Sequence, residues 1–596
     1  MNQDQKQYLL AHYKNKSVKE LAEALALDRK EVQRELRNLL TAPPVPKVKP
    51  PDAESVPASA PGFEFKKYWV WGVLFLIVFF AVLVRIRLLP VPLERDEGDY
   101  AYNAQLLLQG IPPYRDAYEM RLPGIFAAYA LILAAFGQTS SGIHLGLLVM
   151  NALTTIILFF LGRRLFNPAA GLASAAAFAL LSLSASVQGV FANTEHFVIL
   201  PALGGIWLLL YALESNRPRG VFWAGILLGI GFLMKQHGIF FAAFGGLYLA
   251  YFEFSRRPFS WRPALVKSIL FGAGFLLPFG LTCLLLWRAG VFSKFWFWTF
   301  TVAKGYVTSA GEFSSGPLSR FFSKTAAVMK PFFTVWILAG AGLAAFLRVR
   351  IIRPRAFFIL SFLAFSVASI FPGLHFREHY FIFLLPAGAL LCGTAVYAAE
   401  GIFRWPSSGS LRKRTQILLI LFPVLFSIFQ QRGYLLEMAP DAVSRQIYGL
   451  NPFPESPAIA RYIQRNTSET DRVAVIGSEP QIYFYSGRRS ATSYILTYPL
   501  MEIQRYAREM QEEMIRQIEA AAPKFLVFVN VPTSWLTRPE SEKLIFDWAE
   551  RYEKEFYETA GIADLLPEGT QYRWDEAAKG YSPRSPFWVS ILKRRS

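Results

Sequence analysis

Cysteine and charge are both scarce in this sequence. Only two of its 596 residues are cysteine, Cys283 and Cys392, so neither a disulfide framework nor a cysteine-rich metal site is available. Charged residues make up 18% of the chain, whereas soluble globular proteins have roughly 25%. Hydrophobic residues make up 53%. This composition excludes a soluble enzyme and a disordered chain, and it indicates a membrane protein.

Two sequence signatures are also missing. No early apolar stretch is followed by a small-residue cleavage site, so we expect no removable signal peptide. The last part of the chain contains neither a Gly-x-Gly-x-x-Gly motif nor a Walker-type loop. Nucleotide binding is therefore not indicated.

Long apolar runs dominate the middle of the chain. A membrane-spanning helix needs about 20 apolar residues, within a range of roughly 17 to 25. The runs that begin at Gly220 and Gly238 are short for a crossing. If each run crosses once, there are eleven spans: Tyr68–Leu89, Gly142–Leu161, Ala169–Val187, Phe197–Leu213, Gly220–Met234, Gly238–Phe252, Ala264–Trp287, Pro331–Leu347, Ala356–Phe371, Tyr380–Ala399 and Thr415–Gln430.

Positive charge orients these spans. Lys and Arg number 62 against 43 Asp and Glu, and the excess lies in clusters between apolar runs, as is typical of cytoplasmic loops. With the N-terminus inside, all these clusters are cytoplasmic if the apolar stretch Pro123–Phe136 lies along the interface, and all are outside if it crosses. We therefore predict an interfacial helix at this stretch. The clusters begin at Arg163, Arg217, Arg256, Arg348 and Arg404.

Arg85 and Arg87 are exceptions to this charge distribution. They lie at the outer end of the first span. We expect them to snorkel toward water or to meet anionic groups.

The N-terminal part differs from the apolar middle. Capping-box patterns at Ser17–Glu20 and Asp28–Glu31 predict two short helices within residues 1–40. They form either a cytoplasmic helical hairpin or a helix-turn-helix. Residues 41–67 are rich in Pro, Ala and Ser and predict a semi-rigid linker.

Strand and helix signals alternate after residue 430. The predicted strands are Arg472–Gly477, Lys524–Asn530 and Trp588–Lys593, and the predicted helices are Pro499–Ala522 and Glu540–Glu558. The predicted fold class is a polytopic α-helical membrane protein, with about 11 transmembrane helices plus an interfacial helix in residues 68–430. A C-terminal soluble α/β domain follows in residues 431–596, on the extracytoplasmic face.

The unusual polar residues all fall on the predicted outer side. Asp96, Glu97 and Asp99 follow the first span, and this loop is either a solvated turn or part of a site. Arg121 precedes the interfacial stretch, where the phosphate of a lipid would lie, and a guanidinium suits a phosphate by charge and geometry.

Three more short outer segments carry ionisable residues. Glu195 and His196 follow Asn193-Thr194, which is either a helix cap or the edge of a polar cavity. Lys235 and His237 interrupt one long apolar stretch. The third segment contains His375, Arg377, His379 and Tyr380, and its spacing matches no zinc site. We predict no metal site and no cofactor, with a divalent metal as the alternative.

Together these segments resemble the C-type polytopic glycosyltransferases that use polyprenyl-phosphate sugars, such as the protein O-mannosyltransferases and the lipid A aminoarabinose transferase. The resemblance rests on Asp96-Glu97, Arg121-Leu122-Pro123-Gly124 and Leu161–Phe166. It continues in Asn193-Thr194-Glu195, Lys235–Gly238, Arg377–Tyr380 and Gly477–Tyr483. These enzymes commonly show Lys-Pro-Pro or Lys-Pro where this chain has Arg121-Leu122-Pro123.

The resemblance implies roles for these residues. Asp96 is expected to be the catalytic base, with Glu97 beside it, and Arg121 is expected to contact the donor phosphate. Arg377, Tyr380 and Lys235 are expected to bind the same phosphate. The remaining candidates are expected to bind substrate: Asp99, Glu195, His196, His237, His375 and His379.

The predicted function is transfer of a sugar from a polyprenyl-phosphate donor to a hydroxyl acceptor, with inversion, on the extracytoplasmic face. Expected partners are the lipid-linked donor, an acceptor lipid, glycan or protein, and membrane lipids; nucleic acid is not expected. The expected location is the plasma membrane, or the inner membrane in a bacterium. Two alternatives remain: a transporter or flippase of a lipid-linked sugar, and a non-catalytic glycan-binding module.

Overall fold

The computed structural model describes Gln5, Leu9 and His12 together with residues 17–41, 65–304, 316–402 and 409–595. The chain divides into two compact units, Met1–Lys66 and Lys67–Ser596. The first unit contains the two predicted helices, α2 (Val18–Leu25) and α3 (Arg29–Thr41). Ser17 and Glu20 form the predicted capping box at the start of α2. Most of the predicted linker lies outside the described residues.

Every predicted apolar run is helical. Eight helical stretches in the described residues are long and apolar enough to cross a membrane, and four shorter apolar helices accompany them. The protein is therefore a multi-pass membrane protein, and the number of crossings and their orientation stay predictions. One of the four shorter helices is Gly124–Phe136. The helices of the predicted apolar runs are α4 (Phe65–Arg87), α7 (Ser140–Leu165), α8 (Pro168–Leu181), α9 (Thr194–Glu214), α10 (Pro218–Met234), α11 (Ile239–Ser255), α12 (Trp261–Arg288), α16 (Phe333–Arg348), α17 (Ala356–Ala368), α18 (Leu385–Ile402) and α19 (Gly409–Gln430).

Shorter helical elements connect these long helices. The stretch predicted to lie in the interface is the 13-residue helix α6 (Gly124–Phe136), which is shorter than the roughly 17 residues that a crossing needs. The others are α5 (Arg95–Leu108), η1 (Ala185–Val187), η2 (Gln236–Gly238), α13 (Phe292–Trp296), η3 (Phe297–Val302), α15 (Pro317–Met329), η5 (Lys330–Phe332), η6 (Arg350–Arg355), η7 (Glu378–Leu384) and η8 (Gly433–Glu437).

Basic residues gather at one end of the helix bundle. Arg164 Nη2 lies 2.7 Å from Glu214 Oε2, which joins the ends of α7 and α9. Lys267 Nζ lies 2.7 Å from Glu253 Oε1, joining α11 and α12. Arg355 donates to the carbonyl oxygen at the end of α7. This grouping agrees with the predicted separation of basic loops from the polar segments, which meet at the other end.

Arg85 and Arg87 were predicted to reach water or anionic groups, and both instead bind backbone carbonyl oxygens. Arg85 is buried and donates to the carbonyl oxygens of Ser182 and Gly189. Arg87 donates to the carbonyl oxygens of Leu435, Tyr434 and Met438. Both side chains satisfy backbone oxygens where helices end, which explains how two charges are accommodated at the end of α4.

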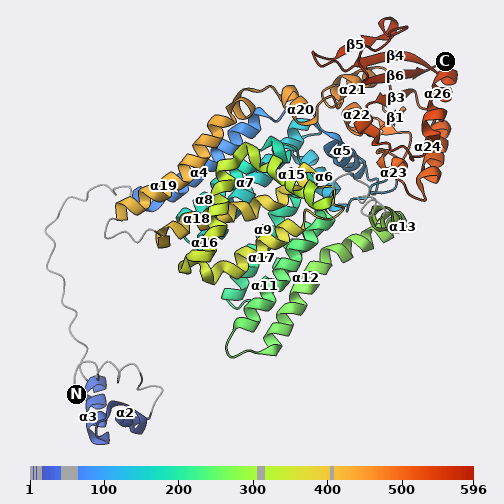
Figure 1. Ribbon diagram of the computed structural model, residues 1–596. Helices are drawn as coiled ribbons and strands as arrows, with labels where there is room; N and C mark the ends of the chain where they lie inside the picture. Colours follow the sequence, from blue (N-terminus) through green and yellow to red (C-terminus); the bar gives the residue numbers. More distant parts are fainter. Residues whose placement is uncertain are drawn as a thin grey trace, which may run out of the picture. The chain divides into compact units, whose positions relative to one another are not determined.

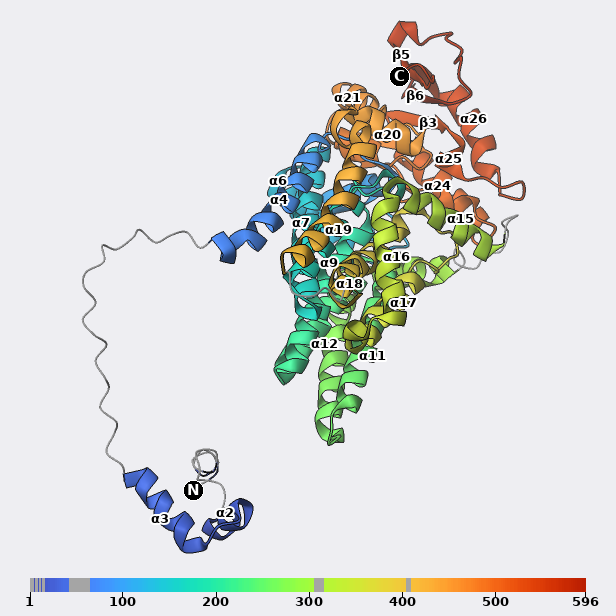
Figure 2. The ribbon, with the colours of Figure 1, turned by 60° about the vertical axis from the view of Figure 1, so that its left-hand side comes forward.

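The C-terminal region forms a six-stranded sheet in the order β2-β1-β3-β6-β4-β5, in which β2, β1 and β3 are parallel and β6, β4 and β5 are antiparallel. It lies at one end of the helix bundle (Figures 1 and 2). Its elements are α20 (Pro440–Tyr448), α21 (Ser456–Arg465), β1 (Arg472–Ile476), α22 (Gln481–Ser486), β2 (Arg489–Ser490), α23 (Tyr498–Met501), α24 (Ala507–Ala521), β3 (Phe525–Asn530), α25 (Pro532–Trp535), α26 (Leu544–Phe556), β4 (Tyr557–Asp564), β5 (Gln571–Trp574), η9 (Asp575–Ala577) and β6 (Trp588–Arg594).

The sheet region shares a hydrophobic core with α5 and α6. Tyr100 of α5 and Phe126 of α6 are fully buried in the same cluster as Val475 of β1 and Ile482 of α22. The α/β region is therefore packed directly on the first loop after α4. This packing brings residues that are almost 400 positions apart into one site.

Candidate active site

A cavity of about 1060 Å³ lies where the sheet region meets the helix bundle. Its walls come from the start of α5, the loop before α6, η1, η2, η3, η7, the end of α20 and the segments that follow β2 and β3. Seven of the predicted site residues line it: Asp96, Arg121, Lys235, His237, Arg377, His379 and Tyr380. The structure thus brings together side chains from four separate sequence segments.

Asp96 lies in the first turn of α5, where Glu94 caps the helix. Arg121 Nη2 lies 2.8 Å from Asp96 Oδ1, and both side chains are about one-fifth exposed. Burial by itself raises the pKa of Asp96, but the positive charges of Arg121, His379, Arg377 and Lys235 lower it to about 2. Asp96 is therefore an ionised carboxylate at neutral pH, and it faces the cavity.

Arg121 is surrounded by carboxylates. Its Nη1 lies 2.9 Å from Glu119 Oε1 and 3.3 Å from Asp99 Oδ2, in addition to the pair with Asp96. The guanidinium also lies over the ring of Tyr100, 5.0 Å from its centroid. Arg121 was predicted to contact the donor phosphate, but its donors are already directed at three acidic side chains. This geometry makes Arg121 the residue that holds Asp96 in place.

The protonation state of Asp99 affects the net charge around Arg121. Burial, and then the nearby Glu119 carboxylate, hold the pKa of Asp99 well above its ordinary value of 3.8, although Arg121 opposes the shift. Asn103 Nδ2 donates to Asp99 Oδ1 at 2.9 Å. Asp99 is thus favoured in its neutral form, which leaves fewer negative charges around the single guanidinium.

Lys235 is held by the predicted residue Glu195. Lys235 Nζ donates to Glu195, which is fully buried. The ammonium also lies 4.3 Å from the ring centroid of Tyr380. Glu195 itself does not line the cavity, so its contact with substrate is not supported. It orients the ammonium of Lys235 instead.

Aromatic and histidine rings surround Lys235 on the same side. The rings of His237 and Tyr380 have centroids 5.3 Å apart, and those of His379 and Tyr380 are 4.9 Å apart. His379 Nδ1 lies 2.9 Å from Gln188 Oε1. With Arg377, these residues form a cationic and aromatic wall.

Glu97 lies apart from the cavity, unlike its neighbour Asp96. Its carboxylate is fully buried outside the cavity lining. It contacts His144 Nε2 at 2.9 Å and accepts from the backbone N–H of Ala192 at 2.5 Å. Side chains at adjacent positions of a helix point about 100° apart, so Asp96 and Glu97 face different surroundings. Glu97 links α5 to α7 and to the loop before α9, and the catalytic role predicted for it is not supported.

Three other predicted residues also lie outside the cavity lining. Asp99 is fully buried behind Arg121, and His196 is buried in the first turn of α9. His375 lies between Gly373 and Arg377, which line the cavity, but is not itself part of the lining. Asp99 and His196 are therefore not placed to contact a substrate in the cavity, and a substrate contact of His375 stays a prediction.

Several residues that line the cavity were not among the predicted site residues. Glu119 lies two positions before Arg121, and this spacing was the available signal. Residues of the sheet region gave no such signal, because they line the cavity only through tertiary packing. They are Gln446, Ile447, Tyr448, Asn451, Phe453, Tyr494, Leu496, Tyr498, Pro499, Thr533 and Leu536.

Comparisons with known proteins confirm the predicted resemblance. The sequence profile of the dolichyl-phosphate-mannose-protein mannosyltransferase family matches residues 121–281. An undecaprenyl phosphate-alpha-4-amino-4-deoxy-L-arabinose arabinosyl transferase of Pseudomonas paraeruginosa is 32% identical over 154 residues, which are 24% of this chain and 27% of that protein. The matched segment therefore spans only about a quarter of the length of this relative.

The fold is shared over a longer range. ArnT from Cupriavidus metallidurans bound to undecaprenyl phosphate matches with a TM-score of 0.54 and 15% identity, over 87% of this chain and 98% of that chain. Its apo structure gives a TM-score of 0.53 and 14% identity, over 88% and 98%. The chain therefore shares the fold of ArnT, and the predicted fold class is confirmed as a polytopic helical membrane protein with a C-terminal α/β region, while the exact number of membrane helices stays a prediction.

Proposed function

We propose that the protein transfers a sugar from a polyprenyl-phosphate donor to a hydroxyl acceptor, with inversion, in this cavity. The observation that carries the proposal is the meeting of Asp96 with Lys235 and Arg377 in one space of about 1060 Å³. A base for the acceptor and cations for a leaving phosphate are the two requirements of this reaction. The similarity to polyprenyl-phosphate-dependent transferases supports it.

Asp96 is the proposed general base. The acceptor hydroxyl oxygen attacks the anomeric carbon while its proton passes to Asp96, and the bond between that carbon and the phosphate oxygen breaks. Positioned base catalysis contributes about 10²–10⁴ in rate. The positive charges near Asp96, which include those of Arg377 and Lys235, lower its pKa. A donor phosphate bound to these two cations would partly neutralise their charge. The pKa of Asp96 would then rise, and Asp96 would become a stronger base.

Lys235 and Arg377 are the proposed ligands of the leaving phosphate. Negative charge grows on that phosphate in the transition state, and fixed cations aimed at it lower the barrier. Glu195 orients Lys235. Arg121 is reassigned from phosphate contact to the positioning of Asp96, because it pairs with three carboxylates.

An apolar side of the cavity supports a lipid donor. It is lined by Ile239, Phe240, Phe300, Ala303 and Pro331, and Ile239 is 41% exposed. A polyprenyl chain that lies along this side would leave its phosphate near Lys235. We propose that the cavity faces away from the cytoplasm in a plasma or bacterial inner membrane and takes an acceptor lipid, glycan or protein.

We also propose that transfer requires no divalent metal. The guanidinium of Arg121 lies among the carboxylates of Asp96, Asp99 and Glu119 and neutralises them in the way that a cation would. Full activity in a chelator is expected. Activity that a chelator abolishes and Mg²⁺ or Mn²⁺ restores would contradict this.

A transfer assay tests the function directly. Purified protein in lipid discs is given a radiolabelled polyprenyl-phosphate sugar and, in turn, a lipid, glycan or protein acceptor. We expect the wild type to form a new glycosidic product. In Asp96→Asn the transfer rate should fall at least about 10³-fold, which lies within the range for base catalysis. The control Asp116→Asn should keep the wild-type rate. Wild-type turnover by Asp96→Asn would remove Asp96 from the mechanism. Donor movement across vesicles without product would support the transporter alternative, which the comparisons do not favour.

A further inference from the structure

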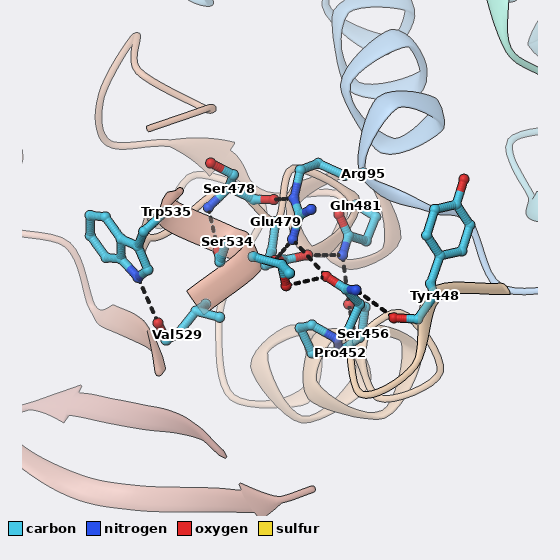
Figure 3. A network of polar contacts seen from close by, with 12 residues as sticks. Arg95, Tyr448, Pro452, Ser456, Ser478, Glu479, Gln481, Val529, Ser534 and Trp535 are labelled. Atoms are coloured by element: carbon cyan, nitrogen blue, oxygen red, sulfur yellow. Dashed lines mark hydrogen bonds and ion pairs between the residues drawn. The ribbon is translucent and has the colours of Figure 1, made fainter. Parts of the chain in front are cut away.

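The helix that carries Asp96 is attached to the sheet region by its neighbour, Arg95. Arg95 Nη2 lies 2.5 Å from Glu479 Oε1 and 3.3 Å from Asn451 Oδ1. Arg95 Nε donates to the carbonyl oxygen of Ser478. Figure 3 shows Arg95 reaching from α5 into the loop that follows β1. The three acceptors belong to residues more than 350 positions away along the chain.

The surroundings of Arg95 fix it further. Its guanidinium carbon lies 5.3 Å from the ring centroid of Phe453 and 5.6 Å from that of Tyr498. Arg95 is 8% exposed and Glu479 is fully buried. A buried charge pair with satisfied hydrogen bonds allows few alternative arrangements, so it defines one position of the helix.

Gln481 completes this attachment. Its Nε2 donates to Glu479 Oε2 at 2.6 Å and to Ser456 Oγ at 3.0 Å, so Glu479 accepts on both oxygens (Figure 3). The backbone of Gln481 also lies against Gly98 of α5. A Cβ on Gly98 would come within 2.5 Å of the Gln481 backbone nitrogen. Only glycine permits this close approach of helix and loop.

More contacts continue along the same face of the helix. The backbone N–H of Leu93 donates to Tyr485 Oη at 2.8 Å, just before the helix begins. The backbone N–H of Ser490 donates to Tyr102 Oη at 2.8 Å, and Gln105 Nε2 donates to the carbonyl oxygen of Phe484 at 3.2 Å. The first three turns of α5 thus contact the segment from β1 to β2.

The geometry points to a positioning role for Glu479 in catalysis. We infer that Glu479, through Arg95 and with the support of Gln481, sets the position of Asp96 against the donor and acceptor. This inference rests on the proposed transferase function. Glu479 touches no substrate, because it is fully buried and does not line the cavity. Arg95 itself lines the cavity, so Glu479 acts on the reaction through Arg95 and the position of α5.

Such a role has a kinetic signature. A displacement of about 1 Å at reacting atoms costs roughly 10²-fold in rate. The proposed phosphate ligands Lys235 and Arg377 lie on other elements, at η2 and η7. A shift of α5 therefore lowers kcat and leaves the KM for the donor unchanged.

The test compares variants of Glu479 in the full-length protein. We expect kcat to fall about 100-fold in Glu479→Ala and about 10-fold in Glu479→Gln, which keeps one acceptor for Arg95, with the donor KM within about twofold of wild type. In the double variant Glu479→Gln/Gln481→Glu the two side chains exchange donor and acceptor groups. We expect it to recover kcat to within about threefold of wild type.

A matched control distinguishes an effect on the position of Asp96 from a general loss of stability. Glu253→Gln breaks an equally buried pair with Lys267 at the other end of the bundle, and we expect it to lower thermal stability but not kcat per folded molecule. Unchanged kcat in Glu479→Ala, a rise in donor KM alone, or no recovery in the double variant would overturn the inference. An inactive wild type would overturn the proposed function together with it, so the two failures are distinguishable.

Discussion

Ion pairs at the two ends of the helix bundle differ in their exposure and in their number of partners. At the basic end, Arg164 and Glu214 form a single pair in which Glu214 is about half exposed. At the cavity end, Arg121 meets three carboxylates, of which Asp99 and Glu119 are almost completely buried. Exposed pairs contribute little to stability, whereas buried charges must be compensated in place. Substitutions in the acidic group around Arg121 should therefore have larger effects than a substitution at Glu214. The Lys267–Glu253 pair, also at the basic end, is buried and is not one of these exposed pairs.

The largest difference between the ends is expected for Arg121→Gln. This change leaves Asp96, Asp99 and Glu119 without the cation that they share, and breaking a buried ion pair costs about 3–5 kcal/mol. Thermal or chemical denaturation in detergent measures the loss. The control Arg115→Gln affects an exposed pair with Asp116, and about 1 kcal/mol or less is expected there. Equal losses in both variants would show that the carboxylate group does not depend on Arg121.

Lys235→Met should have the next largest effect, on donor binding. A hydrogen bond to a charged group contributes about 1.5–3 kcal/mol, which corresponds to a rise of about 10- to 100-fold in the donor KM. Steady-state kinetics with varied donor measure it. Lys294→Met is the control, because Lys294 is exposed and does not line the cavity. A donor KM that does not change in Lys235→Met would remove Lys235 from the phosphate site.

Asp99→Asn should change the pH dependence of stability. The pKa of Asp99 is raised in the folded protein, so its contribution to stability is complete below its ordinary value of about 3.8 and is lost as pH rises through the folded pKa. Asparagine resembles the neutral acid and does not titrate. Melting curves from about pH 4 to pH 8 should therefore decline less in Asp99→Asn than in the wild type. A parallel decline would mean that Asp99 is ionised throughout.

The smallest effect is expected at the basic end. Glu214→Gln removes the exposed partner of Arg164, and the free energy of unfolding should change by no more than about 0.5 kcal/mol. Denaturation measured beside Arg121→Gln gives the comparison. A loss as large as that of Arg121→Gln would erase the distinction between the two ends.

The sequence was sufficient to predict the helices and one side of the site. Apolar runs have a length that the bilayer dictates, so all of them could be found, and ionisable residues beside such runs indicated Asp96, Lys235 and Tyr380. Asp96 and Glu97 could not be distinguished, because both precede the same helix. Only the structure shows that Glu97 turns toward His144.

The sheet region was predicted less completely. Strands β1, β3 and β6 are rich in β-branched and aromatic residues and were found. Strand β4 contains Gly561 and lacks such residues at most positions, and the predicted helix before it extended two residues too far, to Glu558. Partners such as Arg95 and Glu479 are 384 residues apart, and no local pattern indicates that they meet.

That distance has a consequence for biosynthesis. Ribosomes add about 5–20 residues per second, so Glu479 is made roughly 20–80 s after Arg95 at these rates, when most of the membrane helices have already been translated. Until then α5 lacks its contacts with the segment from β1 to β2. A chain that stops before β1 would have all its apolar helices but would lack Glu479 and Gln481, which hold the start of α5.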